Sequence, residues 1–263
     1  MLSNRASHPT TTHVTNFLGS VGDLSLFGVR AIRDSFRPPF EFKEIVTQIS
    51  EVGWRTGPLV IVSGFAIGIV ISLQTRAQMV RFGAQAMIPQ TVSLGIFNDV
   101  GPLFTALLVS GRVGAGIGAE LGGMRVTEQI DALEALAVDS FKYLVATRVV
   151  ACVVALPILT LLLDFSGLAG GMAADLLALH MSIPLFLHDA FSPMTWVEYV
   201  PPILDTLVFG FIIGTLSCYL GYNAERGALG VGRASTRSVV FSSLLVILAE
   251  VILVKSVQFW FPG

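Results

Sequence analysis

The sequence predicts an all-α integral membrane protein with five transmembrane helices, and three observations lead to this prediction. Apolar residues make up 53% of the 263 residues, charged residues only 13%, and the mean hydropathy is +0.76. An average soluble domain carries about 25% charged residues. Five stretches almost without charge are long enough for a helix to cross the hydrocarbon of a bilayer. The basic residues also fall mainly on one side of these stretches, as topology rules require.

The charge-poor stretches place the five spans at about 56–76, 88–112, 148–174, 201–223 and 238–260. Three of the stretches contain a single carboxylate each, at Asp99, Asp164 and Glu250. The second stretch begins at Phe82 and is longer than one membrane crossing needs. We therefore expect 82–90, which includes Pro89, to form an external loop or interfacial segment.

The basic residues set the predicted orientation. If the N-terminus is cytoplasmic, 13 of the 16 Lys and Arg residues fall on the cytoplasmic side, and Arg76, Arg81 and Lys255 remain outside. The positive-inside rule therefore predicts a cytoplasmic N-terminus and an external C-terminus.

The N-terminal region is predicted to differ from the rest of the chain. Residues 1–15 are polar and are expected to be a disordered cytoplasmic tail, with no cleavable signal peptide. In 16–54, apolar residues recur at helical spacing from Phe17 to Phe36 and again after Pro38 and Pro39. This pattern predicts amphipathic elbow helices at the membrane surface. Residues 55–263 are then expected to form the membrane domain.

The stretch GRVGAGIGAELGGM, residues 111–124, raises the question of a nucleotide site. A pyrophosphate-binding glycine turn requires a soluble βαβ unit, which the composition excludes. In a membrane, small residues four positions apart instead allow two helix backbones to approach closely. The sequence therefore predicts close helix packing at Gly64, Gly68, Gly114, Gly118 and Gly122.

Most other site chemistry is absent from the sequence. None of the three lysines, Lys43, Lys142 and Lys255, follows a glycine, so the chain has no phosphate-binding GxxxxGK[ST] loop. We expect no resident cofactor, and any ATP must be bound by a separate subunit. No metal-ligand spacing links the histidines or cysteines, so no metal site is predicted.

The carboxylates inside the predicted spans are the unusual feature. Asp99, Asp164, Asp205 and Glu250 would each cost at least a few kcal/mol in lipid, so each is expected to face a protein interior or a water-filled cavity. Asp164 and Glu250 could instead lie near an interface, where water reaches them. Asn98, Gly101 and Pro102 around Asp99 predict a polar break in the second helix.

The segment from Met124 to Arg148 predicts a short amphipathic helix between the second and third spans. Thr127 is expected to cap its N-terminus. Apolar residues form one stripe, and the opposite face carries Glu128, Asp131 and Glu134. A helix with an acidic face suits docking of a soluble partner, although a solvated connector would show the same pattern.

At this point the sequence resembles a known family. The run GRVGAGIGAELGGMRVTEQIDALEALAVD, preceded by NDVGP and followed by GYNAERGALGVGRASTRSVVFSS, is similar to the MlaE/YrbE family of permeases. The resemblance covers about residues 50–261. These permeases are the membrane subunits of ABC systems that move phospholipids between the inner and outer membranes, so the resemblance implies a multi-pass protein of the bacterial inner membrane. It also implies a homodimer with a lipid cavity between the protomers, a cytoplasmic ABC ATPase, an MCE-domain protein on the periplasmic side and, in some systems, a STAS-domain subunit. No nucleic-acid partner is expected.

The resemblance also assigns residues. The family's cavity-lining region corresponds to Ile71, Gln74, Arg76, Phe82, Asn98, Asp99 and Val100, and the polar positions of the cavity include Asp205 and Glu250. The family's coupling helix corresponds to Glu128, Gln129, Asp131 and Glu134. Two positions depart from the family pattern: Asn98 stands where an arginine is expected, and Asp205 stands where a basic residue is expected. We expect Arg76 to be a new partner for Asp205.

Two other functional classes remain open on the sequence. A proton-coupled secondary transporter could use the intramembrane carboxylates as a relay, although no inverted repeat is visible and five spans divide unevenly. An intramembrane hydrolase could use paired aspartates, but the chain has no recognisable protease motif.

Overall fold

The computed structural model describes residues 9–38, 41–179, 182–192 and 194–260. These residues form helices and connecting turns, with no strand among them. Five helical segments are long and apolar enough to cross a membrane: Phe42–Phe82, Gln85–Val126, Lys142–Leu177, Tyr199–Tyr222 and Ala228–Ser256. The predicted all-α fold with five membrane-spanning helices is therefore confirmed.

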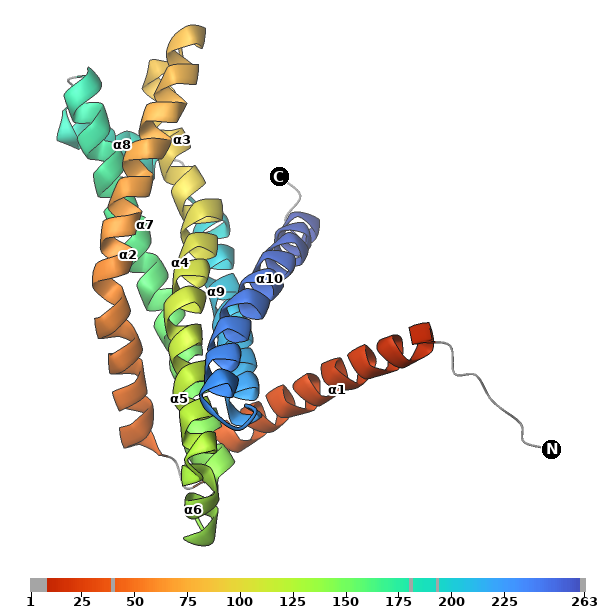
Figure 1. Cartoon of the computed structure of the whole chain (residues 1–263). Coiled ribbons are helices and arrows are strands. Elements are labelled where there is room, and N and C mark those ends of the chain that lie inside the picture. Colours follow the sequence, from red (N-terminus) through yellow and green to blue (C-terminus); the bar gives the residue numbers. More distant parts are fainter. Residues whose placement is uncertain (1–8, 39–40, 180–181, 193, 261–263) are drawn as a thin grey trace.

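The first two helices differ from the predicted N-terminal region. Helix α1 (Pro9–Ser35) already begins inside the segment expected to be a disordered tail, of which 1–8 lies outside the described residues. It projects away from the bundle, as Figure 1 shows. Helix α2 (Phe42–Met79) joins the second amphipathic segment to the first span as one continuous helix that does not end near residue 54. No proline occurs between Phe42 and Pro58, and glycine and proline inside a membrane helix are tolerated.

The second span is the least regular of the five. After the 3₁₀ turns η1 (Val80–Phe82) and η2 (Gln85–Met87), it starts as α3 (Ile88–Gly95), passes through a π turn, η3 (Ile96–Val100), and continues as α4 (Gly101–Val109). A second π turn, η4 (Ser110–Gly114), leads into α5 (Ala115–Val126). Such π turns within α-helices are frequent at functional sites. The predicted polar break at Asn98 and Asp99 lies in η3.

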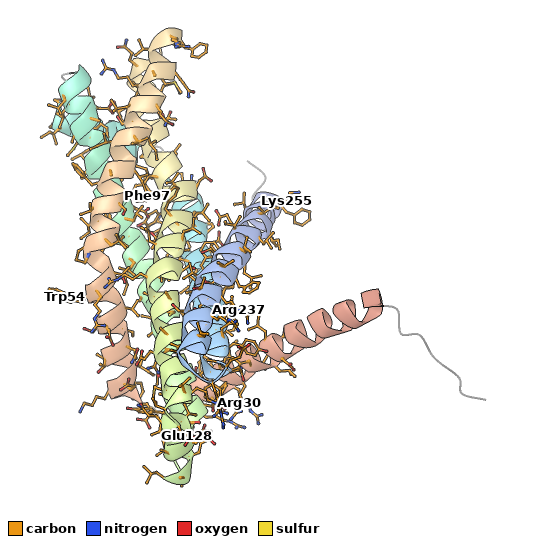
Figure 2. All side chains as sticks on the ribbon, in the orientation of Figure 1. Arg30, Trp54, Phe97, Glu128, Arg237 and Lys255 are labelled. Atoms are coloured by element: carbon orange, nitrogen blue, oxygen red, sulfur yellow. The ribbon has the colours of Figure 1, made fainter. Side chains whose placement is uncertain are left out.

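The remaining elements complete the bundle. They are α6 (Gln129–Ala135), the π turn η5 (Lys142–Ala146), α7 (Thr147–Leu179), α8 (Ile183–Phe191), α9 (Trp196–Tyr222) and α10 (Ala228–Trp260). Helix α6 lies at one end of the spans, which we call the α6 end, and α3 and α8 pack together at the other. Figure 2 shows Arg30 and Glu128 at the α6 end and Lys255 toward the opposite end.

Small residues allow α2 and α7 to pack backbone against backbone. A Cβ atom added at Gly68 would collide with the carbonyl oxygen of Gly167, and one added at Gly64 would lie 2.7 Å from the carbonyl oxygen of Leu163. The same argument holds between α5 and α10, where a Cβ at Gly118 would lie 2.5 Å from Ser238 Oγ. These contacts replace the hydrophobic driving force that is missing between helices in lipid.

The five predicted packing glycines are not equally crowded. A Cβ at Gly114 would lie 3.0 Å from Ser217 Oγ, whereas one at Gly122 would meet its nearest atom, Ala224 Cβ, at an ordinary 3.4 Å. Gly122 therefore leaves room for a small side chain.

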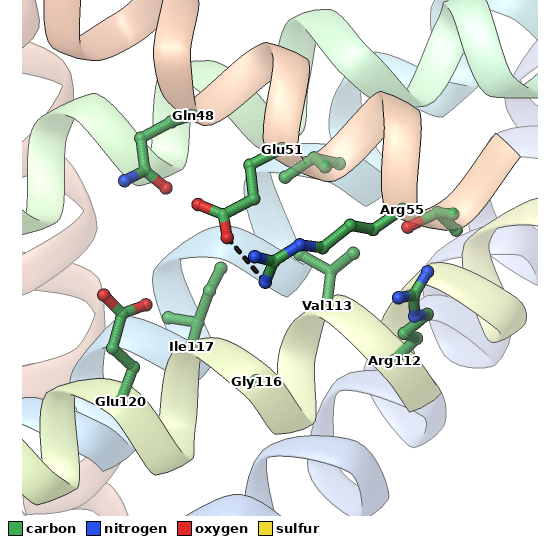
Figure 3. Close-up of a pocket in the computed structure, with 10 residues that line it drawn as sticks. Gln48, Glu51, Arg55, Arg112, Val113, Gly116, Ile117 and Glu120 are labelled. Carbon is green, nitrogen blue, oxygen red and sulfur yellow. Dashed lines mark ion pairs between the residues drawn. The ribbon is translucent and has the colours of Figure 1, made fainter.

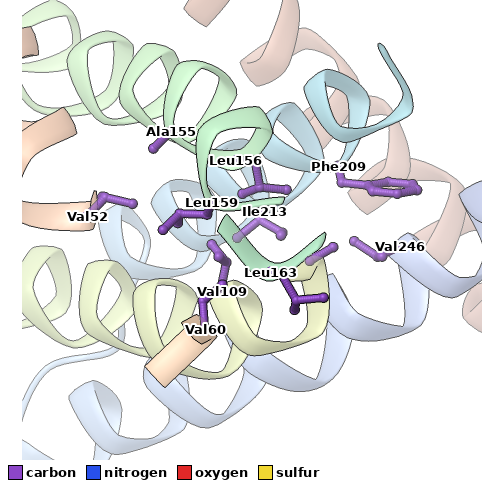
Figure 4. Close-up of a cluster of buried hydrophobic side chains, with 11 residues drawn as sticks. Val52, Val60, Val109, Ala155, Leu156, Leu159, Leu163, Phe209, Ile213 and Val246 are labelled. Atoms are coloured by element: carbon purple, nitrogen blue, oxygen red, sulfur yellow. The ribbon is translucent and has the colours of Figure 1, made fainter. Parts of the chain in front are cut away.

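One apolar core holds the spans together. It combines Val60 of α2, Val109 of α4, Leu159 of α7, Phe209 of α9 and Val246 of α10 with their neighbours (Figure 4). Helix α1 is anchored at the α6 end, where the ring of Phe27 packs edge-on against Phe141 and Tyr219 with centroids 4.8 and 5.4 Å apart. Toward the opposite end, α10 inclines away from the rest of the bundle (Figure 1).

Candidate functional site

Three of the predicted carboxylates converge. Asp99 lies in η3, Asp205 in α9 and Glu250 in α10, and the negative charges of both aspartates act on Glu250. Asp99 is exposed on the single chain, and the other two side chains are half-buried. Among the described residues, no ion pair or hydrogen bond engages these carboxylates, and Glu250 Oε2 is buried without a partner. Three like charges within membrane spans require water or a polar ligand around them.

The break at η3 also shapes the interior beside this cluster. Asp164 of α7 is 1% exposed and packs directly against Gly101, where any Cβ would collide with its carboxylate. Its Oδ1 has no hydrogen-bond partner among the described residues. Asp164 therefore faces the protein interior, one of the surroundings that the sequence predicted for it.

Sequence reasoning missed a second buried acid. Asp175 of α7 is 1% exposed and accepts a hydrogen bond from Ser72 Oγ of α2 at 2.8 Å. The positive charge of Arg76, one turn further along α2, acts on the same carboxylate. The predicted third span ended at residue 174, just before Asp175, whereas the span continues to Leu177. The polar pair Ser72 and Arg76, four residues apart on α2, was the signal that could have revealed a partner on a neighbouring helix.

The structure favours Asp175, rather than Asp205, as the acid that accompanies Arg76. Helix α9, which carries Asp205, packs mainly on α4, α5, α7 and α10 and not on α2. The expected pair between Arg76 and Asp205 therefore joins two helices that are not close neighbours.

The other residues of the predicted cavity set are spread along the same half of the molecule. Ile71 packs on the apolar cluster formed by Ile88, Val92 and Ile96. Gln74 is exposed on α2, and Phe82 is 83% exposed beyond its end. Asn98 and Val100 flank Asp99 in η3 and are both half-buried.

At the α6 end, the short helix α6 is fixed to the bundle by one buried residue. Ile130 is fully buried in a cluster with Leu121 of α5 and Leu144 of η5. Asp131 forms an ion pair with Arg125 at 2.7 Å, and Glu134 Oε1 accepts hydrogen bonds from Ser140 at 2.7 Å and Tyr222 at 3.2 Å. Two of the three acids expected on the docking face are therefore engaged within the chain.

Glu128 and Gln129 remain on the outer surface of α6, and both are exposed. No side-chain hydrogen bond or ion pair of either residue occurs among those described for the chain. Leu136, which the sequence places on one apolar stripe with Ile130, Leu133 and Ala137, follows α6 directly and is 75% exposed. These three side chains form the part of α6 that a partner could contact, and we call them the outer face of α6.

The predicted cap of α6 is wrong. Thr127 Oγ1 donates to the carbonyl oxygen of Gly123 at 2.9 Å and so ends α5, rather than starting α6. The residue that precedes α6 is Glu128, whose positive φ of 58° separates α5 from α6. A left-handed conformation is uncommon for a residue other than glycine, and the sequence pattern of a threonine before an acidic residue could not distinguish the two arrangements.

The described residues contain no group of three His, Cys, Asp or Glu side chains that could hold a metal ion. The converging carboxylates Asp99, Asp205 and Glu250 are therefore not spaced as a metal site. Cys152 and Cys218 are buried free thiols.

Comparisons with known proteins agree with this architecture. The family described as "Permease MlaE" matches residues 45–255. The chain is 37% identical over 251 residues to a "Probable ABC transporter permease protein" of Rickettsia prowazekii, an alignment that covers 95% of this chain and 97% of the relative. It is 30% identical to the "Intermembrane phospholipid transport system permease protein MlaE" of Haemophilus influenzae, with 90% of each chain covered.

A plant relative is also similar. "Protein TRIGALACTOSYLDIACYLGLYCEROL 1, chloroplastic" of Arabidopsis thaliana is 32% identical over 80% of this chain and 60% of its own length. The resemblance recognised in the sequence is thus confirmed by a match that includes all five spans. The chain belongs to the MlaE family of ABC-transporter permeases.

Proposed function

We propose that this chain is the membrane subunit of an ABC-type system that moves phospholipids between the inner and outer membranes. Two copies would enclose a lipid cavity, and a separate cytoplasmic subunit would bind and hydrolyse ATP. Membership of the family and the similarity to a phospholipid transport permease support this proposal.

The exposed carboxylate of Asp99 carries the argument for a cavity between two chains. Asp99 lies within a membrane span, and a charged side chain facing lipid is costly. The neighbouring helix α10 also leaves a broad apolar face exposed, including Phe241, Leu248 and Ile252. A second copy against this side would cover the apolar face and enclose the carboxylates in a polar cavity. The apolar walls would accept lipid tails, and Arg76 is the basic residue best placed to meet a phosphate near the mouth.

The exposed residues on the outer face of α6 support the proposal that the ATPase docks at the α6 end. The chain has no phosphate-binding loop of its own, so the ATPase must contact it from the cytoplasm. Glu128, Gln129 and Leu136 are exposed at the α6 end, and Ile130 connects this helix to the core of the bundle. Movement of a docked ATPase would therefore be passed to α5 and η5, and from there to the spans.

The remaining partners follow from the family. We infer a cytoplasmic N-terminus and an external C-terminus in the bacterial inner membrane, an MCE-domain protein at the periplasmic end and, in some systems, a STAS-domain subunit. Lipid would enter or leave the cavity through the end where Asp99, Asp205 and Glu250 converge.

A proton-coupled secondary transporter is the second candidate, and the same three carboxylates are the observation that favours it. Acidic side chains within membrane spans are the groups that carry protons in such transporters. This candidate requires no ATPase.

Co-purification tests the proposal. The tagged full-length chain is extracted in mild detergent, and the bound proteins and lipids are identified by mass spectrometry. The proposal predicts an ABC ATPase, an MCE-domain protein and phospholipid in the complex. A chain that purifies without an ATPase but transports lipid along a proton gradient would contradict the proposal and support the second candidate.

A further inference from the structure

A polar pocket at the α6 end has no role in the cavity proposed above. It lies between α2 on one side and η4 and α5 on the other and has a volume of about 350 Å³. Its polar lining consists of Gln48, Glu51, Arg55, Thr56, Arg112 and Glu120. Pockets for small molecules usually measure about 300–1,000 Å³, so this one is large enough for a lipid headgroup. Figure 3 shows side chains of the two walls pointing toward one another across the space.

The two arginines of the pocket lie at the same end of two neighbouring spans. Arg55 immediately precedes the charge-free stretch of the first span, and Arg112 immediately follows the charge-poor stretch of the second. Both therefore lie where the hydrocarbon ends and lipid phosphates are found. Arginine forms planar, bidentate hydrogen bonds with phosphate oxygens.

The charges of the pocket do not cancel. Arg55 is paired with Glu51 at 2.6 Å, and Glu120 is paired at 2.7 Å with Arg148, which is 4% exposed. Among the ion pairs between described residues, none includes Arg112, whose side chain is exposed. One positive charge is therefore left over on the wall of the pocket, which complements the single negative charge of a phosphodiester.

A buried hydroxyl group provides an independent indication of a ligand. Thr56 lines the pocket and is only 1% exposed, and its Oγ1 has no hydrogen-bond partner among the described residues. Threonine in a membrane helix commonly donates to the carbonyl oxygen four residues earlier. A buried hydroxyl without a partner costs about 1–3 kcal/mol, which a ligand oxygen in the pocket would recover.

We propose that this pocket binds the phosphodiester of a phospholipid from the cytoplasmic leaflet, with Arg112 and Arg55 as cationic contacts and Thr56 as a hydroxyl contact. The inference rests on the proposed function only in taking a phospholipid as the source of the phosphate. The pocket would hold a lipid at the opposite end of the spans from the carboxylate cluster.

Lipid binding by the purified full-length chain, without its ATPase, tests this inference. Native mass spectrometry measures the affinity for dioleoylphosphatidylglycerol, with dioleoylglycerol as the probe without phosphate. Arg112→Gln is expected to weaken phosphatidylglycerol binding by about tenfold, the effect of losing one charged hydrogen bond, and to leave dioleoylglycerol binding unchanged. Arg112→Lys keeps the charge but loses the bidentate geometry, so it should fall between the two.

Arg237 supplies the matched control. It is an exposed arginine of α10 next to the predicted start of the fifth span, and it does not line the pocket. Arg237→Gln should leave the affinity close to that of the wild type, because Arg237 does not line the pocket. Equal losses in the two glutamine variants, or no loss in either, would overturn the inference.

Filling the pocket gives a test that does not depend on charge. A Cβ at Gly116, which lines the pocket, would meet no atom within 4 Å, and the same is true at Gly123 two turns later in α5, outside the pocket. Gly116→Leu should therefore fold and lose lipid binding, whereas Gly123→Leu should fold and keep it. Gly116→Leu that folds and binds normally would overturn the site.

Inorganic phosphate distinguishes the two sources of the anion. If the lipid is the ligand, millimolar phosphate should not displace phosphatidylglycerol, and full displacement would overturn the lipid as the source. Failure of the proposed function would show elsewhere, in co-purification and transport, because these binding measurements require no ATPase.

Discussion

The two ends of the transmembrane bundle differ in how their charged side chains are paired. At the α6 end, three described ion pairs join basic and acidic side chains: Arg148 with Glu120 at 2.7 Å, Arg125 with Asp131 at 2.7 Å, and Arg233 with Glu225 at 2.9 Å. In the opposite half, Asp99, Asp205 and Glu250 lie near one another with no basic partner among the described ion pairs. Helix α10 also inclines away from the rest of the bundle toward this opposite end (Figure 1).

Apart from the pocket beside Arg112, this difference separates a region held together by ion pairs from a region whose carboxylates have no basic partner among the described ion pairs. Paired charges and glycine contacts hold the α6 end in one arrangement, which allows a docked partner to move it as a unit. Unpaired carboxylates in a membrane span are unfavourable unless water or a polar group reaches them. The predictions below test whether the α6 end is the structural and docking region and the opposite half the transport region.

The largest expected effect is on packing at the α6 end. Leucine at Gly118 would place its Cβ 2.5 Å from Ser238 Oγ and 3.1 Å from the carbonyl oxygen of Ala234, so α5 and α10 could not remain in contact. We expect Gly118→Leu to yield no stably folded protein, measured by size-exclusion chromatography in detergent. Gly122→Ala is the control and should fold normally, since its nearest contact would be an ordinary 3.4 Å. A fully assembled Gly118→Leu protein would contradict the packing account.

A change on the outer face of α6 should abolish coupling without unfolding the chain. Glu128→Lys combined with Gln129→Lys places two positive charges on exposed positions that make no described side-chain contact. An exposed ion pair contributes about 0–1 kcal/mol, but turning attraction into repulsion costs several times that. We expect loss of the co-purified ATPase with a normal melting temperature. Gln85→Lys, an exposed change at the opposite end, should retain the ATPase. If the double variant retains the ATPase normally, α6 is only a connector between the second and third spans.

Neutralising two of the carboxylates should reduce lipid transport without lowering thermal stability. Asp99→Asn with Glu250→Gln removes repulsion between like charges, so the thermal stability should stay the same or rise. Lipid transport by the complete complex should fall by about tenfold or more, because a hydrogen bond to a charged group contributes about 1.5–3 kcal/mol. A loss of stability with unchanged transport would show that the cluster is structural.

The smallest effect is expected for a solvent-exposed pair at the α6 end. Arg233 and Glu225 are 59% and 64% exposed, so their ion pair is largely screened by water. Glu225→Gln should change the free energy of unfolding by at most about 1 kcal/mol and leave transport unaffected. A larger loss would indicate that this loop takes part in docking.

The sequence predicted the five spans because these depend on local composition. Hydrophobic stretches mark the spans wherever they occur in the chain, and glycines four residues apart lie on one helix face whatever the partner helix is. The break at Asn98 and Asp99 was also predictable, since Gly101 and Pro102 follow directly.

Features that depend on partners distant in the chain were not predictable. Ser110 Oγ lies 2.6 Å from Ser242 Oγ and 3.0 Å from Ser243 Oγ, and these hydrogen bonds join η4 to α10 across more than 130 residues. The burial of Asp175 against Ser72 and the engagement of Glu134 by Tyr222 have the same origin. The prediction that Thr127 caps α6 was wrong for a different reason. A threonine between two helices can end the first helix or begin the second, and only the backbone conformation of the folded chain decides which it does.

Reconstituted transport tests the central claim most directly. The chain is placed in liposomes with its co-purified ATPase, and transfer of a fluorescent phospholipid is followed with ATP, without ATP, and with the proton gradient collapsed. Our account predicts transfer that requires ATP, continues without a proton gradient, and is lost in the Asp99→Asn, Glu250→Gln variant. Transfer by the chain alone, driven by a proton gradient and indifferent to ATP, would contradict it.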